Sequence, residues 1–229
     1  MRAAQTRVCD PFAMSDMNHV SPVPEGRLSD SRATQVAATI VLLAGGAGRR
    51  MGGVDKGLEM FRGRPLVSWV LDRIAGQAAE ILISANRNHA RYAEFGYPVV
   101  SDSLDNFAGP LAGLQAGMAA AHHELVGCVP CDTPFLPENL VVRLTDALLA
   151  QHLDVAVART PDRAHPVICI ARKRLHRHLT QFLNAGGRKF DLWYATLATA
   201  EVRFDGLPEA FRNLNCPEDL QEDQGRSRE

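Results

Sequence analysis

The sequence lacks any apolar run of the ~20 residues that a membrane-spanning helix needs. The apolar segment from Val36 to Ala44 is similar in composition to the core of a signal peptide, and Arg32 precedes it. However, this segment begins too late in the chain, behind a polar stretch rich in aspartate. We therefore expect neither a membrane anchor nor a secretion signal, and we predict a soluble protein of the cytoplasm.

A strong excess of charge of either sign is also absent. The chain has 25 Lys and Arg residues against 26 Asp and Glu residues, which gives a formal net charge of −1. Proteins that bind nucleic acid over a broad surface usually carry a clear positive excess. We therefore expect no nucleic-acid partner, and a site for phosphate groups must be a local cluster of cations.

Cysteine is scarce: the chain has five cysteines, and they are scattered along the sequence. Cys128 and Cys131 have the spacing of a redox or metal-binding pair, but there is no second pair and no histidine at ligand spacing. Several cysteines lie in apolar, strand-like runs, where this residue is usually a small reduced hydrophobe. A redox centre and a cysteine-bound metal are therefore not expected.

The length of 229 residues and the apolar content of 46% fit one domain with a tail. Residues 1–35 have no usable hydrophobic period and are rich in proline, serine and charge, so we expect a flexible N-terminal extension. Residues 36–229 would then form a single domain. Met14 and Met17 are alternative starts of the native chain.

From Thr39 onwards, apolar runs of strand length alternate with segments of helical period. The expected strands are 39–43, 80–84, 98–101, 125–129 and 154–158, and the expected helices are one with Pro65 in its first turn that continues to Ile74, 89–95, a helix from Pro110, and 137–149. A short polar turn then separates strand 154–158 from strand 166–170, which predicts an antiparallel hairpin. Helices 173–184 and 188–197, strand 200–204 and a helix start at Pro217 complete the pattern. The fold class is α/β: a Rossmann-like, mostly parallel but mixed sheet with helices on both faces.

The first strand is followed by a loop that is rich in glycine and cations. Five glycines fall between Gly45 and Gly53, and the loop carries Arg49, Arg50 and Lys56 against a single acid, Asp55. Bare backbone amides and positive charge after a buried strand are suited to a polyphosphate. The glycine spacing matches neither a P-loop nor a dinucleotide-binding fingerprint. The alternative is a flexible connector that is basic by chance.

Other polar residues also follow predicted strands. These are the segment from Ser84 to Arg87, Asp102, and the segment from Cys131 to Pro134. Ligands of open α/β sheets bind at the carboxyl ends of strands, so these groups are expected to converge on one site. Asp132 would either hold Mg²⁺ or cap the next helix, and Asp102 would either bind a ligand or belong to an ordinary turn.

The string from Leu43 to Lys56 resembles the signature of the molybdenum cofactor guanylyltransferases, Leu-Ala-Gly-Gly-x-x-x-Arg-Met-Gly-Gly-x-Asp-Lys. The segment from Cys131 to Pro134 resembles the Cys-Asp-x-Pro of the same family, and the segment from Gly109 to Gly113 resembles its Gly-Pro-Leu-x-Gly. The resemblance implies the nucleotide-diphospho-sugar-transferase type of fold. It also implies transfer of GMP from GTP to the terminal phosphate of molybdopterin, with release of pyrophosphate and with Mg²⁺ as cofactor.

The resemblance also implies roles for particular residues. The implied catalytic residues are Lys56, Arg50 and Asp132, and the implied metal ligands are Asp132 and Asn215. The implied nucleotide-binding residues are Leu43, Ala44, Gly45, Gly46, Arg49, Lys56, Ser84, Asn86, Asp102 and Asp132. Ser84 departs from the family, which often has asparagine there, and Cys216 replaces a threonine after Asn215. Weaker candidates for the pterin site are His165, Arg188, Lys189 and Asn213.

Several alternatives stay open. Arg49 and Arg50 are suited to either the donor or the acceptor anion. The nucleotide-binding half would span about residues 36–150 and the acceptor-binding half about 151–221. A cytidylyltransferase of the same fold and a non-catalytic nucleotide-binding module are the other two functions considered. Transient contacts with other proteins of molybdenum cofactor biosynthesis, or with the enzymes that receive the cofactor, are also expected.

Overall fold

The computed structural model describes residues 36–44, 55–102 and 109–214. The N-terminal extension 1–35, most of the glycine-rich loop and the expected helix start at Pro217 lie outside the described residues. Among the described residues, no helix combines the length and the hydrophobicity needed to cross a bilayer.

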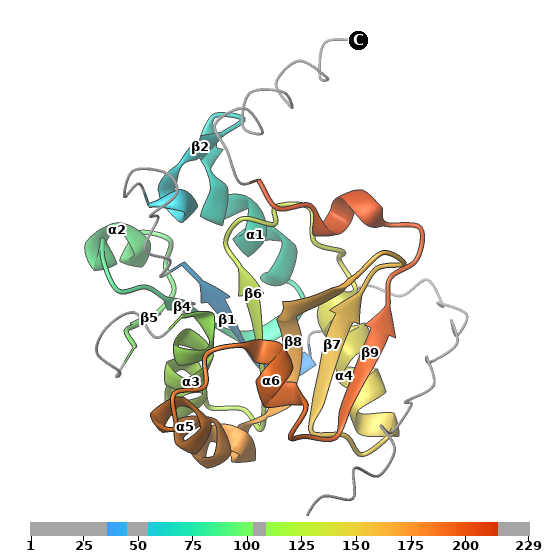
Figure 1. Cartoon of the computed structure of the whole chain (residues 1–229). Coiled ribbons are helices and arrows are strands. Elements are labelled where there is room, and N and C mark those ends of the chain that lie inside the picture. Colours follow the sequence, from blue (N-terminus) through green and yellow to red (C-terminus); the bar gives the residue numbers. More distant parts are fainter. Residues whose placement is uncertain (1–35, 45–54, 103–108, 215–229) are drawn as a thin grey trace, which may run out of the picture.

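A seven-stranded mixed sheet forms the centre of the molecule, with the strand order β5-β4-β1-β6-β8-β7-β9 (Figure 1). All pairings are parallel except those of β8, which runs antiparallel to both β6 and β7. The predicted hairpin and the mostly parallel sheet are therefore confirmed. The strands are β1 (Val36–Leu43), β4 (Ala78–Ser84), β5 (Val99–Val100), β6 (Leu125–Pro130), β7 (Val155–Arg159), β8 (Ala164–Arg172) and β9 (Thr199–Arg203).

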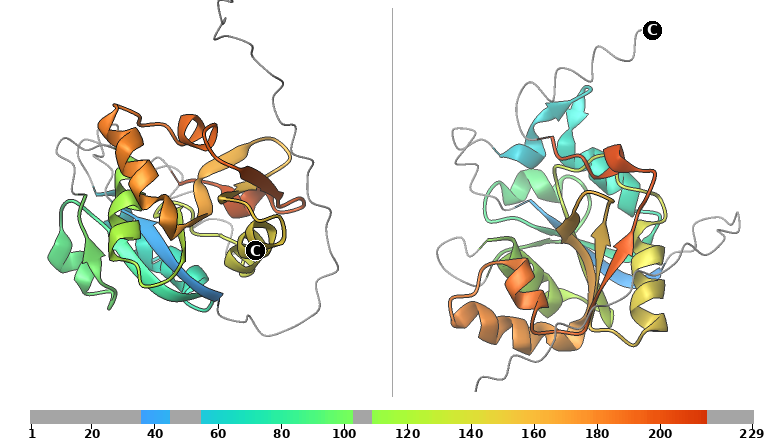
Figure 2. Two further views of the ribbon diagram at one scale, coloured as in Figure 1. Left: turned by 90° about the horizontal axis from the view of Figure 1, so that it is seen from below. Right: turned by 45° about the vertical axis from the view of Figure 1, so that its right-hand side comes forward.

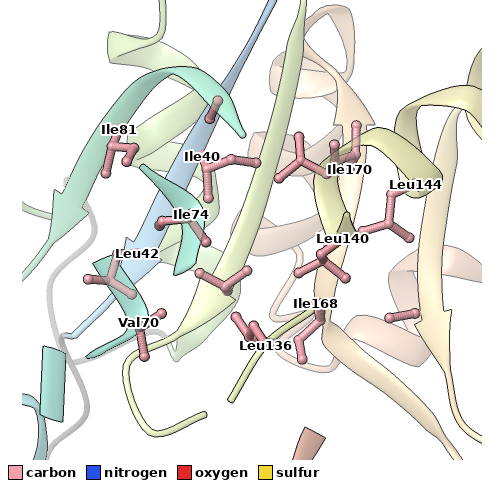
Figure 3. Close-up of a cluster of buried hydrophobic side chains, with 14 of the residues drawn as sticks. Ile40, Leu42, Val70, Ile74, Ile81, Leu136, Leu140, Leu144, Ile168 and Ile170 are labelled. Atoms are coloured by element: carbon pink, nitrogen blue, oxygen red, sulfur yellow. The ribbon is translucent and has the colours of Figure 1, made fainter. Parts of the chain in front are cut away.

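Helices cover both faces of this sheet (Figure 2). Helices α1 (Leu66–Ile74) and α4 (Leu140–Ala150) pack on one face, where Ile40 and Leu42 of β1 point (Figure 3). Helices α3 (Pro110–Ala120), α5 (His176–Asn184) and α6 (Phe190–Tyr194) pack on the other, where Val41 and Leu43 of β1 point. Since alternate residues from Ile40 to Leu43 enter two different cores, this part of β1 is a continuous apolar run, as is usual for a strand buried on both faces.

Some element boundaries differ from the sequence-based expectation. Helix α4 begins at Leu140 and not at Pro137, because the Gln77 side chain accepts a hydrogen bond from the Val141 amide (2.9 Å) and donates one to the Pro137 carbonyl (2.9 Å). The helix expected over 173–184 is split into a 3-10 turn, η3 (Lys173–Leu175), and α5, and the helix expected over 188–197 is shortened to α6.

Three short elements were not predicted. They are the 3-10 turns η2 (Lys56–Leu58) and η4 (Pro208–Phe211), and the hairpin of β2 (Met60–Phe61) and β3 (Arg64–Pro65). The hairpin turn has Arg62 at φ 48° and Gly63 at φ 78°. Two positive φ values are typical of the tight turns that join short antiparallel strands. The expected helix over 89–95 is present as α2 (His89–Ala93).

The topology brings the chemically interesting segments to one edge of the sheet. In the parallel register, Leu43 at the end of β1 is level with Ser84 of β4 and Pro130 of β6. The segments that follow these three strands therefore begin side by side. Because β8 runs in the opposite direction, its first residues, near His165, lie at the same edge.

Candidate active site

The backbone at the end of β1 is fixed by its two neighbours. The Leu43 carbonyl accepts a hydrogen bond from the Cys131 amide (3.2 Å), and the Ala44 amide donates to the Ser84 carbonyl (2.8 Å). Both residues therefore lie at the predicted edge, directly before the glycine-rich loop. Gly45, Gly46, Arg49 and Arg50 lie outside the described residues, so their roles stay predictions.

The loop returns to the sheet at Lys56, which begins the turn η2. The Lys56 ammonium donates to Asp132 Oδ2 at 2.6 Å, and the exposed fractions of the two side chains are 23% and 14%. The pair is thus largely enclosed but still reachable from solvent. Two residues that are 76 positions apart in the sequence, both predicted to be catalytic, are brought into direct contact.

The segment around Asp132 is held by the C-terminal part of the described chain. The Asp132 carbonyl accepts a hydrogen bond from the Leu214 amide (2.9 Å), and the Leu214 side chain packs with Phe61 and Leu66. The Thr133 hydroxyl lies 3.3 Å from both Asp132 Oδ1 and Asn213 Oδ1. Asn213 therefore lies next to Thr133 and Asp132, and its contact with the pterin stays a prediction, whereas Asn215 lies outside the described residues.

The alternative role of Asp132, as a helix cap, is not supported. Helix α4 begins only at Leu140 and has Asn139 at its N-cap position. The Asp132 carboxylate instead faces Lys56 at the sheet edge. In this position the Asp132 carboxylate is accessible to a ligand bound at the sheet edge.

Asn86 and Asp102 form a second polar pair at the same edge. The Asn86 amide group donates to Asp102 Oδ2 (2.8 Å), and the Asp102 backbone amide donates to Asn86 Oδ1 (2.9 Å). Asp102 Oδ1 is buried and has no hydrogen-bond partner within the described part of the chain. Burial raises the pKa of Asp102, although the Asn86 hydrogen bond acts in the opposite direction. A buried acceptor of this kind is suited to a donor supplied by a ligand.

Ser84 has a different environment from these residues. Its side chain is only 2% exposed, and a Cβ atom added to Gly113 of α3 would lie 2.6 Å from the Ser84 hydroxyl oxygen. The hydroxyl is therefore packed beneath α3. A contact between Ser84 and the nucleotide stays a prediction, and the position of the side chain favours a packing role.

Two pterin-site candidates from the second half of the chain, His165 and Arg188, interact with residues close to them in the fold. His165 stacks on Phe211 with 4.7 Å between ring centroids, and its Nε2 atom lies 2.9 Å from the Thr160 hydroxyl oxygen. Burial, and then the charge of Arg163, lowers the pKa of His165, so the ring is neutral near pH 7. Arg188 donates to the carbonyls of Leu183 (2.6 Å) and Gly187 (2.7 Å) after the end of α5.

Lys189, by contrast, is exposed directly before α6. Pterin contacts by Lys189, Arg188 and His165 stay predictions.

One residue near the site, Tyr92, was not predicted from the sequence to have a functional role. The hydroxyl of Tyr92, on the short helix α2, donates to Asp55 Oδ1 at 2.6 Å. No motif includes Tyr92, and a tyrosine in a short polar helix carries no signal that distinguishes it from a packing residue. Only the folded chain places it beside the glycine-rich loop.

The carboxylate of Asp132 is a hard oxygen donor of the kind that a divalent cation binds. The described residues contain no cluster of three or more His, Cys, Asp or Glu side chains that would hold a metal alone. A single carboxylate, Asp132, stands at the strand end. Mg²⁺ commonly binds through one or two carboxylates and completes its shell with water and substrate phosphates. The residues present therefore fit a cation that arrives with a nucleotide.

Comparisons with known proteins agree with this geometry. Residues 40–197 match the model of the MobA-like NTP transferase domain. A molybdenum cofactor guanylyltransferase of Shewanella sp. (strain MR-4) is 46% identical over 181 residues, which covers 79% of this chain and 92% of the relative.

Solved structures share the fold. The molybdopterin-guanine dinucleotide biosynthesis protein A of Archaeoglobus fulgidus has a TM-score of 0.67 at 20% identity, covering 82% of this chain and 98% of the other. A Mycobacterium tuberculosis protein solved in complex with manganese has a TM-score of 0.60 at 16% identity, covering 82% of this chain and 97% of the other. From the sequence relationship, the chain belongs to the MobA-like NTP transferase family and, within it, to the molybdenum cofactor guanylyltransferases.

Proposed function

We propose that this protein transfers GMP from GTP to the terminal phosphate of molybdopterin, forming molybdopterin guanine dinucleotide and releasing pyrophosphate. The observation that carries the proposal is the contact of Lys56 with Asp132 at the carboxyl ends of β1 and β6. This contact is found in a chain that is 46% identical to a molybdenum cofactor guanylyltransferase. The cation and the carboxylate are the two groups that a nucleotide–metal complex needs at one place.

The reaction needs no nucleophile from the protein. A terminal phosphate oxygen of the acceptor forms a bond to the α-phosphorus of GTP, while the bond from that phosphorus to the bridging oxygen breaks and pyrophosphate leaves with the electron pair. The protein therefore has to position two anions and to neutralise their charge. We assign Lys56 to the triphosphate, where its ammonium would neutralise charge that develops on the leaving group. Arg49, Arg50 and the loop amides would complete this contact.

Asp132 would hold a divalent cation together with Asn215, and we propose Mg²⁺ as that cation. Bound there, the cation would act as a Lewis acid on the α-phosphate of GTP. The hard oxygen of Asp132 and the manganese complex of the Mycobacterium tuberculosis protein support a divalent cation. Lys56 would have to move from Asp132 towards the phosphates when nucleotide and cation bind.

We propose guanine as the preferred base. Guanine presents N1–H and N2–H donors together with an O6 acceptor, and Asp102 Oδ1 is a buried acceptor beside Asn86. A site whose buried polar groups pair with one base leaves them unpaired with another, which disfavours the wrong substrate. We expect kcat/KM for GTP to exceed that for CTP, ATP and UTP by at least ~10²-fold.

The test is GMP transfer by the purified full chain, with molybdopterin and Mg²⁺, and with the four nucleoside triphosphates in parallel. The wild-type chain should form the guanine dinucleotide, and Asp132→Ala should abolish turnover while the chain stays folded, with a lower melting temperature because the enclosed Lys56 ammonium loses the carboxylate that it faces. Equal use of CTP and GTP would contradict the guanylyl assignment. Tight GTP binding without any pyrophosphate release would instead favour a non-catalytic module.

We further propose that residues 36–150 bind the nucleotide and residues 151–221 the acceptor, and that the protein works in the cytoplasm. Transient contacts with other proteins of cofactor biosynthesis, or with the enzymes that receive the cofactor, would allow the product to be handed over directly. Co-purification from a molybdenum-replete cell extract, followed by mass spectrometry, would test these contacts. Cell fractionation would test the location.

A further inference from the structure

The Asp55 carboxylate is enclosed by three side chains from the segment that follows β4. Asp55 Oδ1 accepts the hydrogen bond from the Tyr92 hydroxyl (2.6 Å), and Oδ2 accepts one from the Asn88 side chain (2.8 Å). The Arg87 guanidinium Nε lies 3.8 Å from the same Oδ2. Only 8% of the Asp55 side chain is exposed. Both oxygens of this carboxylate are therefore used within the chain and not directed at a substrate.

The segment that receives Asp55 is itself well fixed. Tyr92 is fully buried, and burial, followed by the effects of Cys131 and Asp55, raises the pKa of its hydroxyl. This hydroxyl therefore keeps its proton and remains a donor. Asn88 has φ 54°, a left-handed conformation that asparagine tolerates better than most residues. The side chains that bind the Asp55 carboxylate are therefore held in place by the fold, and the contact is not an incidental one between surface residues.

The same hydroxyl also faces Gly57, the residue on the other side of Lys56. A Cβ atom added to Gly57 would lie 2.6 Å from the Tyr92 hydroxyl oxygen and 3.4 Å from Cys131 Sγ. Tyr92 therefore leaves no room for a side chain at Gly57, and Cys131, which precedes Asp132, lies close by. Tyr92 thus lies beside the backbone on both sides of Lys56: it is hydrogen-bonded to the carboxylate of Asp55, and it occupies the space that a side chain at position 57 would need.

We infer that Tyr92 is a positioning residue for Lys56 and acts through Asp55 and Gly57. The inference rests on the proposed function, because it assigns Tyr92 the task of fixing the backbone of Lys56, from which the ammonium would reach the triphosphate beside Asp132. Catalysis by charge neutralisation depends on groups that are already in place before the reaction. A displacement of about 1 Å in such a group can lower the rate ~10²-fold.

The experiment compares Tyr92→Phe with Tyr97→Phe in the full-length protein. Tyr92→Phe removes only the hydroxyl and leaves the buried ring, whereas Tyr97 is a partly buried tyrosine on the neighbouring segment and serves as the matched control. We expect Tyr92→Phe to lower kcat for GMP transfer by about 10- to 100-fold. Tyr97→Phe should stay within about twofold of wild type, the size of effect usual for a surface substitution away from special features.

The decisive readout is the same substitution in a Lys56→Ala background. If Tyr92 acts by placing Lys56, Tyr92→Phe should cause little further loss of kcat or of GTP affinity once Lys56 is gone. If Tyr92 only stabilises the fold, its effects should add in both backgrounds. Equal losses in the two backgrounds, or a kcat for Tyr92→Phe equal to that of the control, would overturn the inference.

A second variant keeps the test valid if Tyr92→Phe folds poorly. Gly57→Ala pushes on the same hydroxyl from the opposite side, and its effect should likewise vanish in the Lys56→Ala background. The affinity of GTP with Mg²⁺, measured by calorimetry, does not depend on turnover. If the wild-type chain binds GTP but transfers nothing, the proposed function fails, and the affinities of the variants still decide the role of Tyr92.

Discussion

At the scale of single residues, most polar groups of the candidate site are paired with one another, whereas Asp102 Oδ1 has no hydrogen-bond partner within the described residues. Lys56 is paired with Asp132, Asp55 with Tyr92 and Asn88, and Asn86 with Asp102. Removing Asp132 would take away the carboxylate that the enclosed Lys56 ammonium faces, so a substitution in this pair affects stability as well as function. Substitutions must therefore be judged by activity and by stability together.

Lys56→Ala should lower the rate of GMP transfer by about 10²–10³, which is the usual cost of removing one group that stabilises transition-state charge. GTP binding should also weaken. The measurement is steady-state kinetics beside the melting temperature. Arg177→Ala, which removes an exposed cation on α5, is the control and should leave both quantities unchanged. An effect of less than twofold on transfer would show that Lys56 is an ordinary loop charge.

Asp102→Asn should weaken GTP binding without lowering the stability of the fold. Asn can still accept the Asn86 hydrogen bond, but it loses the charge at Oδ1, so KM for GTP should rise about ten- to 100-fold, the value of a hydrogen bond to a charged group. The pKa of Asp102 is raised above its ordinary 3.8. The ionised carboxylate therefore costs folding stability at pH values above its folded pKa.

The variant should accordingly melt at or above the wild-type temperature at pH 7, and the difference should disappear as the pH falls below 3.8, where the carboxyl is protonated in both states. Thermal unfolding across this range gives the comparison. A variant that is less stable at pH 7, with an unchanged KM, would contradict the assignment of Oδ1 to the nucleotide.

At the scale of secondary-structure elements, α3 lies unusually close to the sheet because two of its residues are glycine. A Cβ atom at Gly117 would lie 2.2 Å from Val41 Cγ2, and one at Gly113 would lie 2.8 Å from Leu43 Cδ2. Both contacts involve β1, the strand that leads into the glycine-rich loop. The helix therefore determines where that strand ends relative to β4.

Gly117→Ala should destabilise the protein by about 1–3 kcal/mol, because an added methyl group in a close-packed interface forces the helix and strand apart. This expected loss exceeds the gain in helix propensity from glycine to alanine. Urea unfolding gives the free energies. Gly76→Ala is the matched control, since a Cβ atom there has no neighbour within 4 Å, and it should be neutral or slightly stabilising. Equal effects of the two substitutions would exclude the packing explanation.

The sequence predicted the long elements well and the short ones poorly. Strands such as β1 and β6 are continuous apolar runs, and α3 begins at the predicted Pro110. The β2–β3 hairpin has only two residues per strand, which is too short for any period. The start of α4 depends on Gln77, which is distant in the sequence. Contacts between distant residues cannot be read from local patterns.

The same limit applies to the candidate site. Lys56 and Asp132 were predicted from motifs and lie together, and Asp102 was predicted and carries a buried acceptor. By contrast, the hydroxyl of Ser84 is beneath α3, a position that follows from Gly113 on a helix predicted separately. Tyr92 was not singled out because its role depends on the path of the chain and not on its neighbours in sequence.

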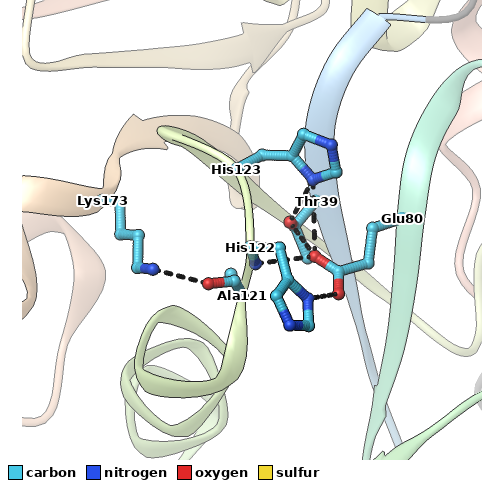
Figure 4. A network of polar contacts seen from close by, with 6 residues as sticks. All are labelled: Thr39, Glu80, Ala121, His122, His123 and Lys173. Atoms are coloured by element: carbon cyan, nitrogen blue, oxygen red, sulfur yellow. Dashed lines mark hydrogen bonds and ion pairs between the residues drawn. The ribbon is translucent and has the colours of Figure 1, made fainter.

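At the scale of the whole molecule, a second polar network ties the sheet together at the edge opposite the site (Figure 4). Glu80 of β4 accepts hydrogen bonds from the Thr39 hydroxyl (2.5 Å) and the His122 amide (2.9 Å), and it also contacts the rings of His122 (2.5 Å) and His123 (3.4 Å). Burial alone would raise the pKa of Glu80, but the hydrogen bonds from His122 and Thr39 outweigh it and lower the pKa to about 2.

The stabilisation from Glu80 should therefore be complete above its ordinary pKa of 4.5 and be lost as the pH falls towards 2. Glu80→Gln should cost about 1.5–3 kcal/mol at pH 7, as expected for hydrogen bonds to a charged group, and much less at pH 2. Urea unfolding at the two pH values provides the test, with the exposed neighbour Glu124→Gln as control. A loss that is independent of pH would exclude the carboxylate as its source.

Strand β8 also limits how this protein can change by recombination. It comes from the second half of the chain, yet it pairs along one side with β6 of the first half and along the other with β7. A gene exchange near residue 150 would therefore replace one partner of the β6–β8 ladder and leave the other, so the two halves are not interchangeable modules. New acceptor specificity in this family is more accessible through point substitutions along the shared edge of the sheet than through shuffling of gene segments.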